Sequence, residues 1–397
     1  MGRPDVAIVG GGIGGLTLGL ALRRHGIRAR IYEQAPELGE VGAAVALAAN
    51  GTRVLRELGL EPALAAASTV PTELVYRHWT GPRLVDIPVG EGYAAQFGAP
   101  FWGIHRARLQ DALASAWGTE DLHLGKELVD VEMLGGRTRL TFADGTDTTA
   151  TLVVGADGIR SRVRARIADE APVYSGASGF RGLVPRSAVP ELPDPDAVQF
   201  WMGPGAHVLH YAIGDVVNFL AVVDGPDPWP GPGGMIPAAP GELEEAFRDW
   251  HPAVRALLGA VPQSPRWGLF ALPPLPRWSA DRMVLLGDAA HAMVPHHGQG
   301  ANLTLEDAAV LADLLADTTS DADLPAALAT YERLRRCRTR QVARSAWVTS
   351  PLLHLPDGPA ARARDRRLAD LVEDFSWIHA YDHREPAGLR TRRKASA

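Results

Sequence analysis

The residues from Leu285 to Asp307 combine a carboxylate, a glycine turn and the start of a helix. An apolar run ends at Gly287, Asp288 follows at once, and Gly298-Gln299-Gly300 precedes a helix-like run that begins near Ala301. A carboxylate at a strand tip accepts hydrogen bonds from hydroxyls, and the N–H groups of a helix start stabilise negative charge. The stretch therefore suits a ligand with a polyol near Asp288 and an electron-rich ring near Gly300 and Ala301.

A second ligand-binding pattern lies near the start of the chain, at Gly10-x-Gly12-x-x-Gly15. It follows an apolar strand at 5–9, opens a helix-like run at 16–25, and is followed by a second strand at 29–33. In this βαβ context glycines permit the tight turn, let the backbone approach a pyrophosphate and let helix and strand pack closely. The residues predicted to bind are Gly10, Gly12, Ile13, Gly14 and Gly15, with the Glu33 carboxylate on a ribose hydroxyl.

A third turn joins the other two. Val153 to Gly158 reads VVGADG, which places Asp157 in a glycine-containing turn after another apolar strand. Asp-Gly is common in plain surface turns, so this motif indicates a ligand-binding site only in combination with the other two motifs. The N-terminal glycines indicate a dinucleotide without separating NAD from FAD. The polyol and ring site around Asp288 favours FAD.

Taken together, the motifs resemble the single-component FAD-dependent aromatic hydroxylases, also called group A flavoprotein monooxygenases, such as salicylate, 3-hydroxybenzoate and 6-hydroxynicotinate hydroxylases. The resemblance runs through GGGIGGL, EVGAAVALAANGTRVLRELGL, HRARL, GADGIRS, FRGLV, WMGPGAHVLHY and GDAAHAMVPHHGQGAN. It implies a Rossmann-like α/β FAD-binding domain interleaved with an antiparallel β-sheet substrate domain and followed by C-terminal helices. It further implies that Arg106 contacts FAD, that Val45 lies beside the ring, and that the Asp157 turn serves FAD and the nicotinamide nucleotide.

The same resemblance implies an activity. In these enzymes NADH or NADPH reduces FAD, O2 forms a C4a-hydroperoxyflavin, and a small aromatic acid is hydroxylated. The expected substrate is a hydroxybenzoate, an amino-hydroxybenzoate or a hydroxypyridine acid. The Ala-, Arg-, Gly- and Pro-rich composition suggests a role in antibiotic biosynthesis. The alternatives are an oxidoreductase or a halogenase on the same scaffold, although the halogenase signature Trp-x-Trp-x-Ile-Pro is absent, and a non-catalytic flavin-binding protein.

Three residues are predicted to act on the substrate. His207 and Tyr211 are four apart on a predicted strand, so both side chains project from one face. His207 would act as a base and Tyr211 would orient the substrate or relay a proton. Some relatives that hydroxylate hydroxybenzoates carry the same His-x-x-x-Tyr pair, and Gln299 matches a substrate-contacting glutamine in some of them. Each residue also has a purely structural interpretation, as a packed strand residue or a turn residue.

The pocket wall is predicted to include Arg181, Phe219 and Phe270. Arg181 can attract a substrate carboxylate, and it can equally support a loop near the flavin. A rival interpretation makes His291, His296 and His297 a metal site. Their spacing matches no familiar ligand pattern and no cysteine accompanies them, so we expect no metal.

The chain is expected to divide into interleaved parts. Apolar runs at 283–286 return to the first sheet, strand-like runs at 198–223 are separated by turns, and 305–334 is predicted to be largely helical. The predicted segments are FAD-binding 1–70, a substrate-domain hairpin 71–98, FAD-binding 99–170, a β-sheet substrate domain 171–280, FAD-binding 281–325, and a C-terminal helical region with tail 326–397.

Bulk properties narrow the range of partners. The 397 residues carry a net charge of −6, which argues against nucleic-acid binding. No segment has the ~20 uninterrupted apolar residues of a membrane span, and the single Cys337 suits a reducing compartment. We therefore expect a cytoplasmic monomer or homodimer whose partners are a small aromatic substrate and O2.

Overall fold

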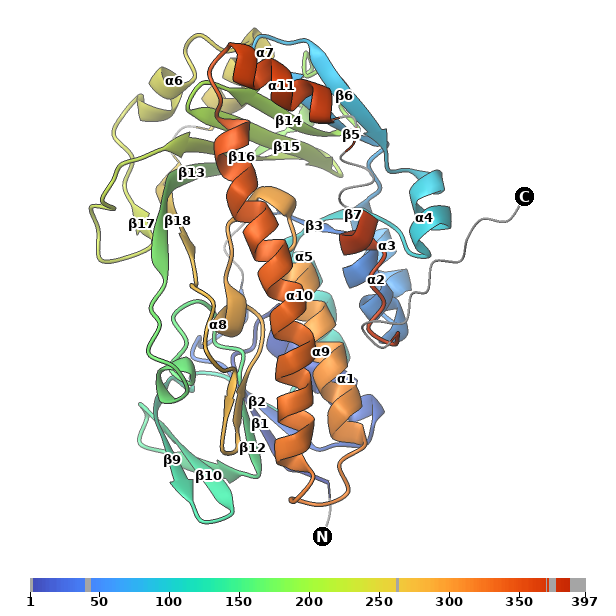
Figure 1. The fold of residues 1–397 in the computed structure, drawn as a ribbon, viewed down its shortest axis with the longest axis vertical. Helices are drawn as coiled ribbons and strands as arrows, with labels where there is room; N and C mark the ends of the chain where they lie inside the picture. The colour runs from blue at the N-terminus through green and yellow to red at the C-terminus, as the bar shows by residue number, and fades with distance from the viewer. Residues whose placement is uncertain (1–2, 40–43, 262–263, 369, 371–375, 386–397) are drawn as a thin grey trace.

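Two large β-sheets, one above the other along the long axis, form the frame of the molecule (Figure 1). The structure is a computed structural model that describes residues 3–39, 44–261, 264–368, 370 and 376–385. The end of the predicted C-terminal tail, residues 386–397, lies outside the described residues. Within the described part, no helix combines the length and the apolar character needed to cross a membrane.

The lower sheet is mainly parallel and carries the nucleotide-binding motifs. Its order is β19-β20-β12-β1-β2-β8, and only the edge strand β19 runs antiparallel to its neighbour. All four residues of β1 and of β12 are buried and apolar, as expected for strands covered on both faces. The strands are β1 (Val6–Val9), β2 (Ala29–Tyr32), β8 (Leu122–His123), β12 (Leu152–Gly155), β19 (Ser279–Ala280) and β20 (Met283–Leu285).

Helices and a small meander cover this sheet. The helix α1 packs against α9 and α5, and α10 packs against α9, while β11 contacts β1 and β10 contacts β12. The helices are α1 (Ile13–Arg24), α5 (Arg106–Trp117), α9 (Gly300–Ala316) and α10 (Leu324–Leu353). The meander strands are β9 (Leu128–Leu134), β10 (Arg137–Phe142) and β11 (Asp147–Ala150). Figure 1 shows α10 running from the lower domain up to the second sheet.

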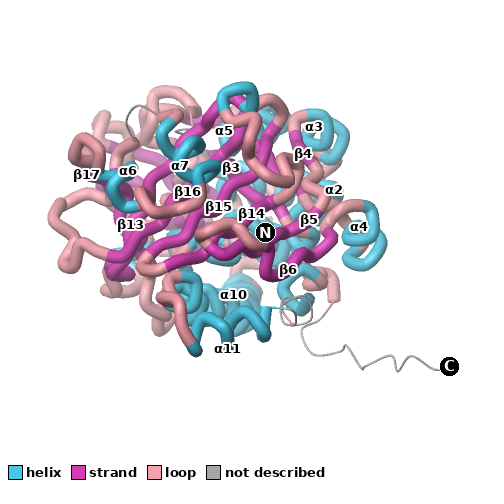
Figure 2. The backbone as a smooth tube through the Cα atoms, turned by 90° about the horizontal axis from the view of Figure 1, so that it is seen from above, coloured by secondary structure: helices cyan, strands magenta, loops and turns pink. Residues whose placement is uncertain are grey.

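The upper sheet has eight strands in the order β17-β18-β13-β16-β15-β14-β5-β6 (Figure 2). It is antiparallel except where β14 runs parallel to β5, which enters from the early hairpin. Side chains on β15 and β16 alternate between a core under α6 and α7 and the face toward the lower domain. The strands are β5 (Glu73–His78), β6 (Arg83–Pro88), β13 (Val173–Pro185), β14 (Val198–Gly203), β15 (Ala206–Ile213), β16 (Val216–Asp224), β17 (Met235–Ile236) and β18 (Arg266–Ala271).

The remaining elements connect the two sheets. A three-stranded sheet, β3-β7-β4, contacts β15 from below. Its strands are β3 (Ala44–Leu47), β4 (Ser68–Thr69) and β7 (Trp102–His105). The other α-helices are α2 (Ala49–Glu57), α3 (Glu61–Ala66), α4 (Glu91–Phe97), α6 (Glu242–Ala246), α7 (Pro252–Gly259), α8 (Asp288–His291) and α11 (Pro359–Leu368). Short 3-10 turns occupy Arg164–Arg166, Arg186–Ala188 and Pro295–His297.

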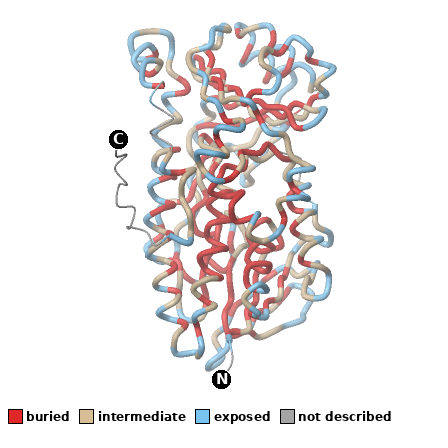
Figure 3. Tube along the Cα trace, turned by 90° about the vertical axis from the view of Figure 1, so that its right-hand side faces the viewer, coloured by how far each residue is buried: buried red, intermediate tan, exposed pale blue. Residues whose placement is uncertain are grey.

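The structure confirms the fold class and the largely helical run at 305–334. The βαβ unit at the N-terminus and the hairpin at 73–88 form as predicted. The helical run is divided in two, because α9 ends at Ala316 and α10 begins at Leu324. The Asp323 carboxylate accepts hydrogen bonds from the backbone N–H groups of Thr319 and Ser320, which stabilises the break. Buried residues run through both domains in Figure 3, with exposed residues on the outer loops.

Candidate active site

A cavity of about 980 Å³ brings the three sequence motifs together between the two sheets. Residues of the N-terminal glycine turn, of the Asp157 turn and of the 286–304 stretch line it. The predicted residues that line it are Gly10, Gly12, Ile13, Gly14, Glu33, Val45, Arg106, Asp157, Arg181, Tyr211, Phe219, Asp288, Gln299, Gly300 and Ala301. Among the described residues that were predicted, Gly15, His207 and Phe270 do not line this cavity.

The N-terminal glycines are required by close packing. Gly10 has φ +109°, and a Cβ there would lie 2.3 Å from the carbonyl oxygen of Ala156. A Cβ at Gly15 would lie 1.9 Å from the carbonyl oxygen of Gly10, so Gly15 acts by packing and not by lining the cavity. A Cβ at Gly12 meets nothing within 4 Å. It would project into open space at the start of α1, where a helix N-terminus binds phosphate.

The carboxylates of the site differ in how far the protein has already satisfied them. Glu33 accepts hydrogen bonds from the N–H groups of Gly11 and Ala35, which fixes its orientation at the end of β2. Burial raises the pKa of Asp157, while hydrogen bonds from Ser161 and nearby backbone N–H groups oppose that rise. One of its oxygens, Oδ1, is buried without a hydrogen-bond partner among the described residues.

Asp288 is the acceptor that the protein leaves open. It is the first residue of α8 and its side chain is exposed at the cavity. No hydrogen bond or ion pair to Asp288 occurs within the described ranges. Gly300 starts α9 on the other side of the turn, and a Cβ there would meet nothing within 4 Å. A dinucleotide with a polyol and an anionic ring fits these groups, because each offers an unsatisfied acceptor or a free helix N-terminus.

The upper wall of the cavity is the lower face of β15 and β16. Leu209 and Tyr211 lie directly opposite Leu220 and Asn218 in the antiparallel register, and all four line the cavity. Burial raises the pKa of Tyr211 well above its usual range, so this phenol stays neutral and can donate a hydrogen bond. Sequence reasoning missed Asn218, because its place opposite Tyr211 depends on how the two strands pair.

Phe219 and Phe270, which were predicted to form the pocket wall, pack their rings against other parts of the protein. The side chain of Phe219 is fully buried in the core under α6 and α7, because it alternates with the cavity-facing Asn218 and Leu220. Phe270 packs against Tyr174 and Trp229, with ring centroids 5.5 and 6.2 Å away. Neither ring presents its face to the cavity, so the aromatic contribution to the upper wall comes from Tyr211.

Arg181 brings a partly buried positive charge to the cavity. Its guanidinium lies 5.5 Å from the centroid of the Trp267 ring, and it has no ion-pair partner among the described residues. Burial lowers the pKa of Arg181, and the nearby Arg106 charge lowers it further. A partly buried cation without an ion-pair partner is stabilised by an anionic ligand.

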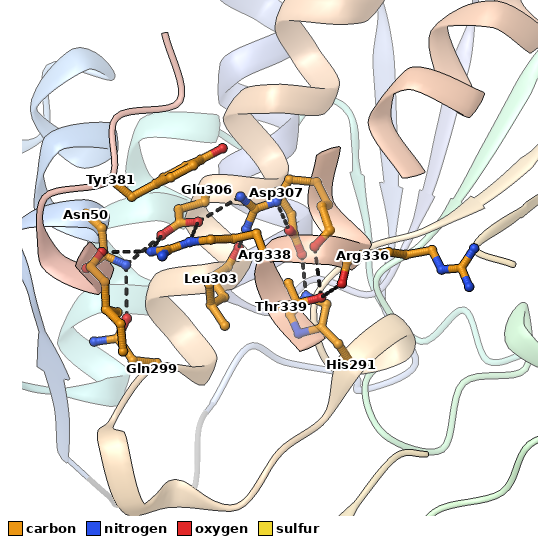
Figure 4. Close-up of polar contacts among 12 residues, drawn as sticks. Asn50, His291, Gln299, Leu303, Glu306, Asp307, Arg336, Arg338, Thr339 and Tyr381 are labelled. Atoms are coloured by element: carbon orange, nitrogen blue, oxygen red, sulfur yellow. Dashed lines mark hydrogen bonds and ion pairs between the residues drawn. The ribbon is translucent and has the colours of Figure 1, made fainter. Parts of the chain in front are cut away.

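Asn50 connects Gln299 to a buried network of charged side chains (Figure 4). Asn50 Nδ2 donates to Gln299 Oε1 at 2.9 Å and to Glu306 Oε1 at 2.6 Å. This fixes the carbonyl side of Gln299 and leaves its Nε2 amide with no hydrogen-bond partner in the described part of the chain. Glu306 in turn pairs with Arg335 and Arg338 of α10. The turn beside the cavity is therefore anchored to α10.

The same network supports the strand tip that carries Asp288. Asp307 accepts hydrogen bonds from the Gly287 N–H and from Arg335, and its Oδ2 lies 2.6 Å from His291 Nε2. Burial would raise the pKa of Asp307, but His291 and Arg335 hold it below its usual value. This network could not be predicted from isolated charges in helix-like runs, because its members come from segments far apart in the chain.

The three histidines of the rival metal site lie in different surroundings. His291 contacts Asp307, His296 packs against the ring of His207, and His297 Nε2 lies 3.0 Å from Ser345 Oγ. A metal site needs ligand atoms that converge on one point. These three side chains do not converge, which argues against a metal bound by this trio.

His207 is buried at 2% exposure on the same face of β15 as Leu209 and Tyr211. Its Nδ1 lies 2.7 Å from Nε2 of His354, the residue that follows α10. Burial lowers the pKa of His207 well below its usual value, and His296 and His354 lower it further. This imidazole is therefore neutral at pH 7, as a base must be.

Comparisons with known proteins agree with this geometry. The profile of the FAD binding domain family matches residues 3–214 and 274–346. The chain is 40% identical to 3-amino-4-hydroxybenzoate 2-monooxygenase PtmB3 of Streptomyces platensis over 98% of each chain. It is 41% identical to 3-amino-4-hydroxybenzoate 2-monooxygenase of Streptomyces cremeus over 94% of each chain. Its structure is similar to that of Klebsiella pneumoniae HpxO complexed with FAD and uric acid, with a TM-score of 0.82 and 26% identity over 94% of this chain and 95% of that one. The chain therefore belongs to the FAD-dependent aromatic hydroxylases, the group A flavoprotein monooxygenases.

Proposed function

We propose that this monooxygenase hydroxylates an amino-hydroxybenzoate, and that 3-amino-4-hydroxybenzoate is its preferred substrate. The observation that carries the proposal is the partly buried Arg181 at the cavity, which has no ion-pair partner among the described residues and suits a carboxylate. Tyr211 and Gln299 add polar groups for an amino or hydroxyl substituent, and Leu209 and Leu220 offer apolar contact to a ring. The printed names of the two Streptomyces relatives support the same substrate class.

The residues of this chain have separate tasks in the reaction. Bound FAD would accept a hydride from NADH or NADPH and activate O2, so that one oxygen atom enters the ring and the other leaves as water. The Asp157 and Asp288 carboxylates and the helix starts at Gly12 and Gly300 would hold the flavin. The strands β15 and β16 cover the cavity and exclude water, which protects the activated oxygen from release as H2O2.

The chemistry of an amino-hydroxybenzoate explains why the site needs a proton acceptor. An amino group activates the ring carbon next to it, and replacement of that carbon's hydrogen by hydroxyl releases a proton. A hydroxyl group that activates the ring loses its own proton in the same cycle. A neutral histidine near the cavity can accept either proton, and His207 is such a group.

Arg181→Met is expected to raise KM for carboxylated aromatic substrates by about 10- to 100-fold, with a smaller change in kcat, because one charge-assisted hydrogen bond is lost. The measurement is steady-state NAD(P)H oxidation with 3-amino-4-hydroxybenzoate and with its carboxamide. The carboxamide lacks the negative charge, so it should bind equally weakly to the unchanged protein and to Arg181→Met. Arg186→Met, which removes a surface pair with Asp196 just beyond β13, serves as control. An unchanged KM in Arg181→Met would remove Arg181 from carboxylate binding.

His207→Ala is expected to slow hydroxylation by about 100-fold and to divert reduced oxygen to H2O2, because a positioned base typically contributes 10²- to 10⁴-fold. FAD content should stay normal, because His207 does not line the cavity. The ratio of product to NAD(P)H consumed measures the effect. His210→Ala is the control, because His210 faces the other side of β15 and accepts from Trp201. Equal uncoupling in both variants would show a general packing effect.

A panel of acids tests the substrate assignment. Turnover of 3-amino-4-hydroxybenzoate, 4-hydroxybenzoate, salicylate and 6-hydroxynicotinate is compared by kcat/KM and product mass. The proposal expects the highest kcat/KM and the tightest coupling for the amino-hydroxybenzoate. A clear preference for 6-hydroxynicotinate or salicylate would overturn the substrate assignment while leaving the monooxygenase family intact.

A further inference from the structure

A continuous line of hydrogen-bonding groups leads from the interior beside the cavity to the surface. His207 Nδ1 lies 2.7 Å from His354 Nε2, and His354 Nδ1 lies 2.5 Å from Asp224 Oδ1. The His354 side chain is 4% exposed and the Asp224 side chain is 64% exposed. The inner end of the line is therefore buried, and its outer end is exposed to solvent.

Three different elements hold these groups in place. His207 is on β15, Asp224 ends β16, and His354 follows the last residue of the long helix α10. Backbone hydrogen bonds tie them together, because Gly205 N–H donates to the His354 carbonyl and Asp224 N–H donates to the Gly205 carbonyl. Because His354 lies at the C-terminal end of α10, the helix dipole also favours a transient positive charge on its ring.

The hydrogen-bond line determines the tautomer of each ring. An ionised Asp224 can only accept, so His354 Nδ1 must donate to it. A neutral His354 then offers Nε2 as an acceptor, and His207 Nδ1 must be the donor. With its proton on Nδ1, neutral His207 has a bare Nε2. No hydrogen bond to this nitrogen occurs within the described ranges, so it is free to accept a proton.

The His207 ring does not line the cavity, but it lies next to residues that do. Leu209 and Tyr211, on the same face of β15, line the cavity. His296 contacts the His207 ring at a centroid distance of 5.2 Å, and its neighbour Pro295 lines the cavity. Both ring nitrogens of His296 are buried without a hydrogen-bond partner among the described residues. The titratable groups facing His207 are thus His296 from the turn and His354 from the end of α10.

We propose that His207, His354 and Asp224 form a proton relay that carries the proton lost by the aromatic substrate from the cavity to solvent. His207 Nε2 takes up the proton as His207 Nδ1 gives its own to His354 Nε2. His354 Nδ1 then gives its proton to Asp224, which releases it to water. After this transfer both rings carry their proton on Nε2, and each returns to the starting tautomer between turnovers by losing that proton to water and gaining one on Nδ1. The inference rests on the proposed function for the origin of the proton and adds two residues, His354 and Asp224, which position and discharge the base.

The first test compares turnover of the holoenzyme with 3-amino-4-hydroxybenzoate as pH and variant are changed. Asp224→Asn and His354→Gln are expected to slow the hydroxylation step by about 10- to 100-fold near neutral pH, part of the usual gain from a positioned base. The loss should shrink as pH rises, because hydroxide then removes the proton, and anaerobic flavin reduction should be unchanged. Asp215→Asn, an exposed carboxylate just before β16, is the matched control. Wild-type rates and an unchanged pH profile in both variants would overturn the relay.

The second test needs no turnover, so it separates the relay from the proposed function. In holoenzyme labelled with ¹⁵N-histidine, we expect His207 to appear as a neutral ring protonated on Nδ1 across pH 6–8, assigned by its absence in His207→Ala. Asp224→Asn should shift the His354 and His207 signals together. The relay would be contradicted, even with normal turnover, if His207 were protonated on Nε2 or if Asp224→Asn left the His354 and His207 signals unchanged. Absence of turnover with every aromatic acid would instead count against the proposed function.

Discussion

Arg335→Met is expected to lower the free energy of unfolding by about 3–5 kcal/mol, the usual cost of removing one partner from a buried ion network. The Arg335 side chain has no exposed surface and pairs with both Glu306 and Asp307, which are equally buried. Without Arg335, the buried carboxylates of Glu306 and Asp307 share fewer positive partners, and their negative charge is less well compensated. Denaturant-induced unfolding followed by circular dichroism measures the change.

Arg340→Met provides the matched control for this prediction. Arg340 is an exposed residue of the same helix, and its loss should change the free energy of unfolding by no more than about 0.5 kcal/mol. Arg335→Met should also loosen FAD, since Asp307 holds the Gly287 N–H beside Asp288. An equal, small effect of both substitutions would show that the buried network does not stabilise the fold.

Gly12→Val is expected to weaken FAD binding by at least about 100-fold, close to 2.7 kcal/mol, while the apoprotein remains folded. A Cβ at Gly12 meets no protein atom within 4 Å, so the side chain is tolerated without ligand. It would occupy the space beside the start of α1 that the pyrophosphate needs. Flavin fluorescence quenching on titration of the apoprotein measures the affinity.

Gly259→Val is the control for the glycine prediction. Gly259 is exposed at the end of α7 and does not line the cavity, and a Cβ there also meets nothing within 4 Å. This variant should bind FAD like the unchanged protein. If Gly12→Val binds FAD with the same affinity, the pyrophosphate does not lie at the start of α1.

The cofactor end of the site could be predicted from the sequence because local patterns encode it. A strand, a glycine turn and a helix fix the placement of Gly10 to Gly15, Glu33 follows β2 directly, and Asp288 lies just beyond the end of β20. The carboxyl ends of neighbouring parallel strands meet at one edge of a sheet, so motifs far apart in the chain converge. The cavity lining includes residues of all three motifs.

The substrate end could be predicted only in part, because it depends on how strands pair and how deep each side chain lies. Period-two alternation correctly placed His207 and Tyr211 on one face of β15. It could not show that the cavity reaches Tyr211 and stops short of His207, nor that Phe219 faces the opposite core. The partners His354 and Asp224 come from other elements, and a single sequence carries no signal for such contacts.

The central claim, that this chain is an aromatic monooxygenase, is tested most directly by the origin of the new oxygen atom. The FAD-loaded protein is supplied with NADH or NADPH and 3-amino-4-hydroxybenzoate under ¹⁸O2, and the product is analysed by mass spectrometry. We expect a product with one added oxygen atom, and that atom is ¹⁸O. Stimulated NAD(P)H oxidation that yields only labelled H2O2 with this and every other aromatic acid of the panel would contradict it.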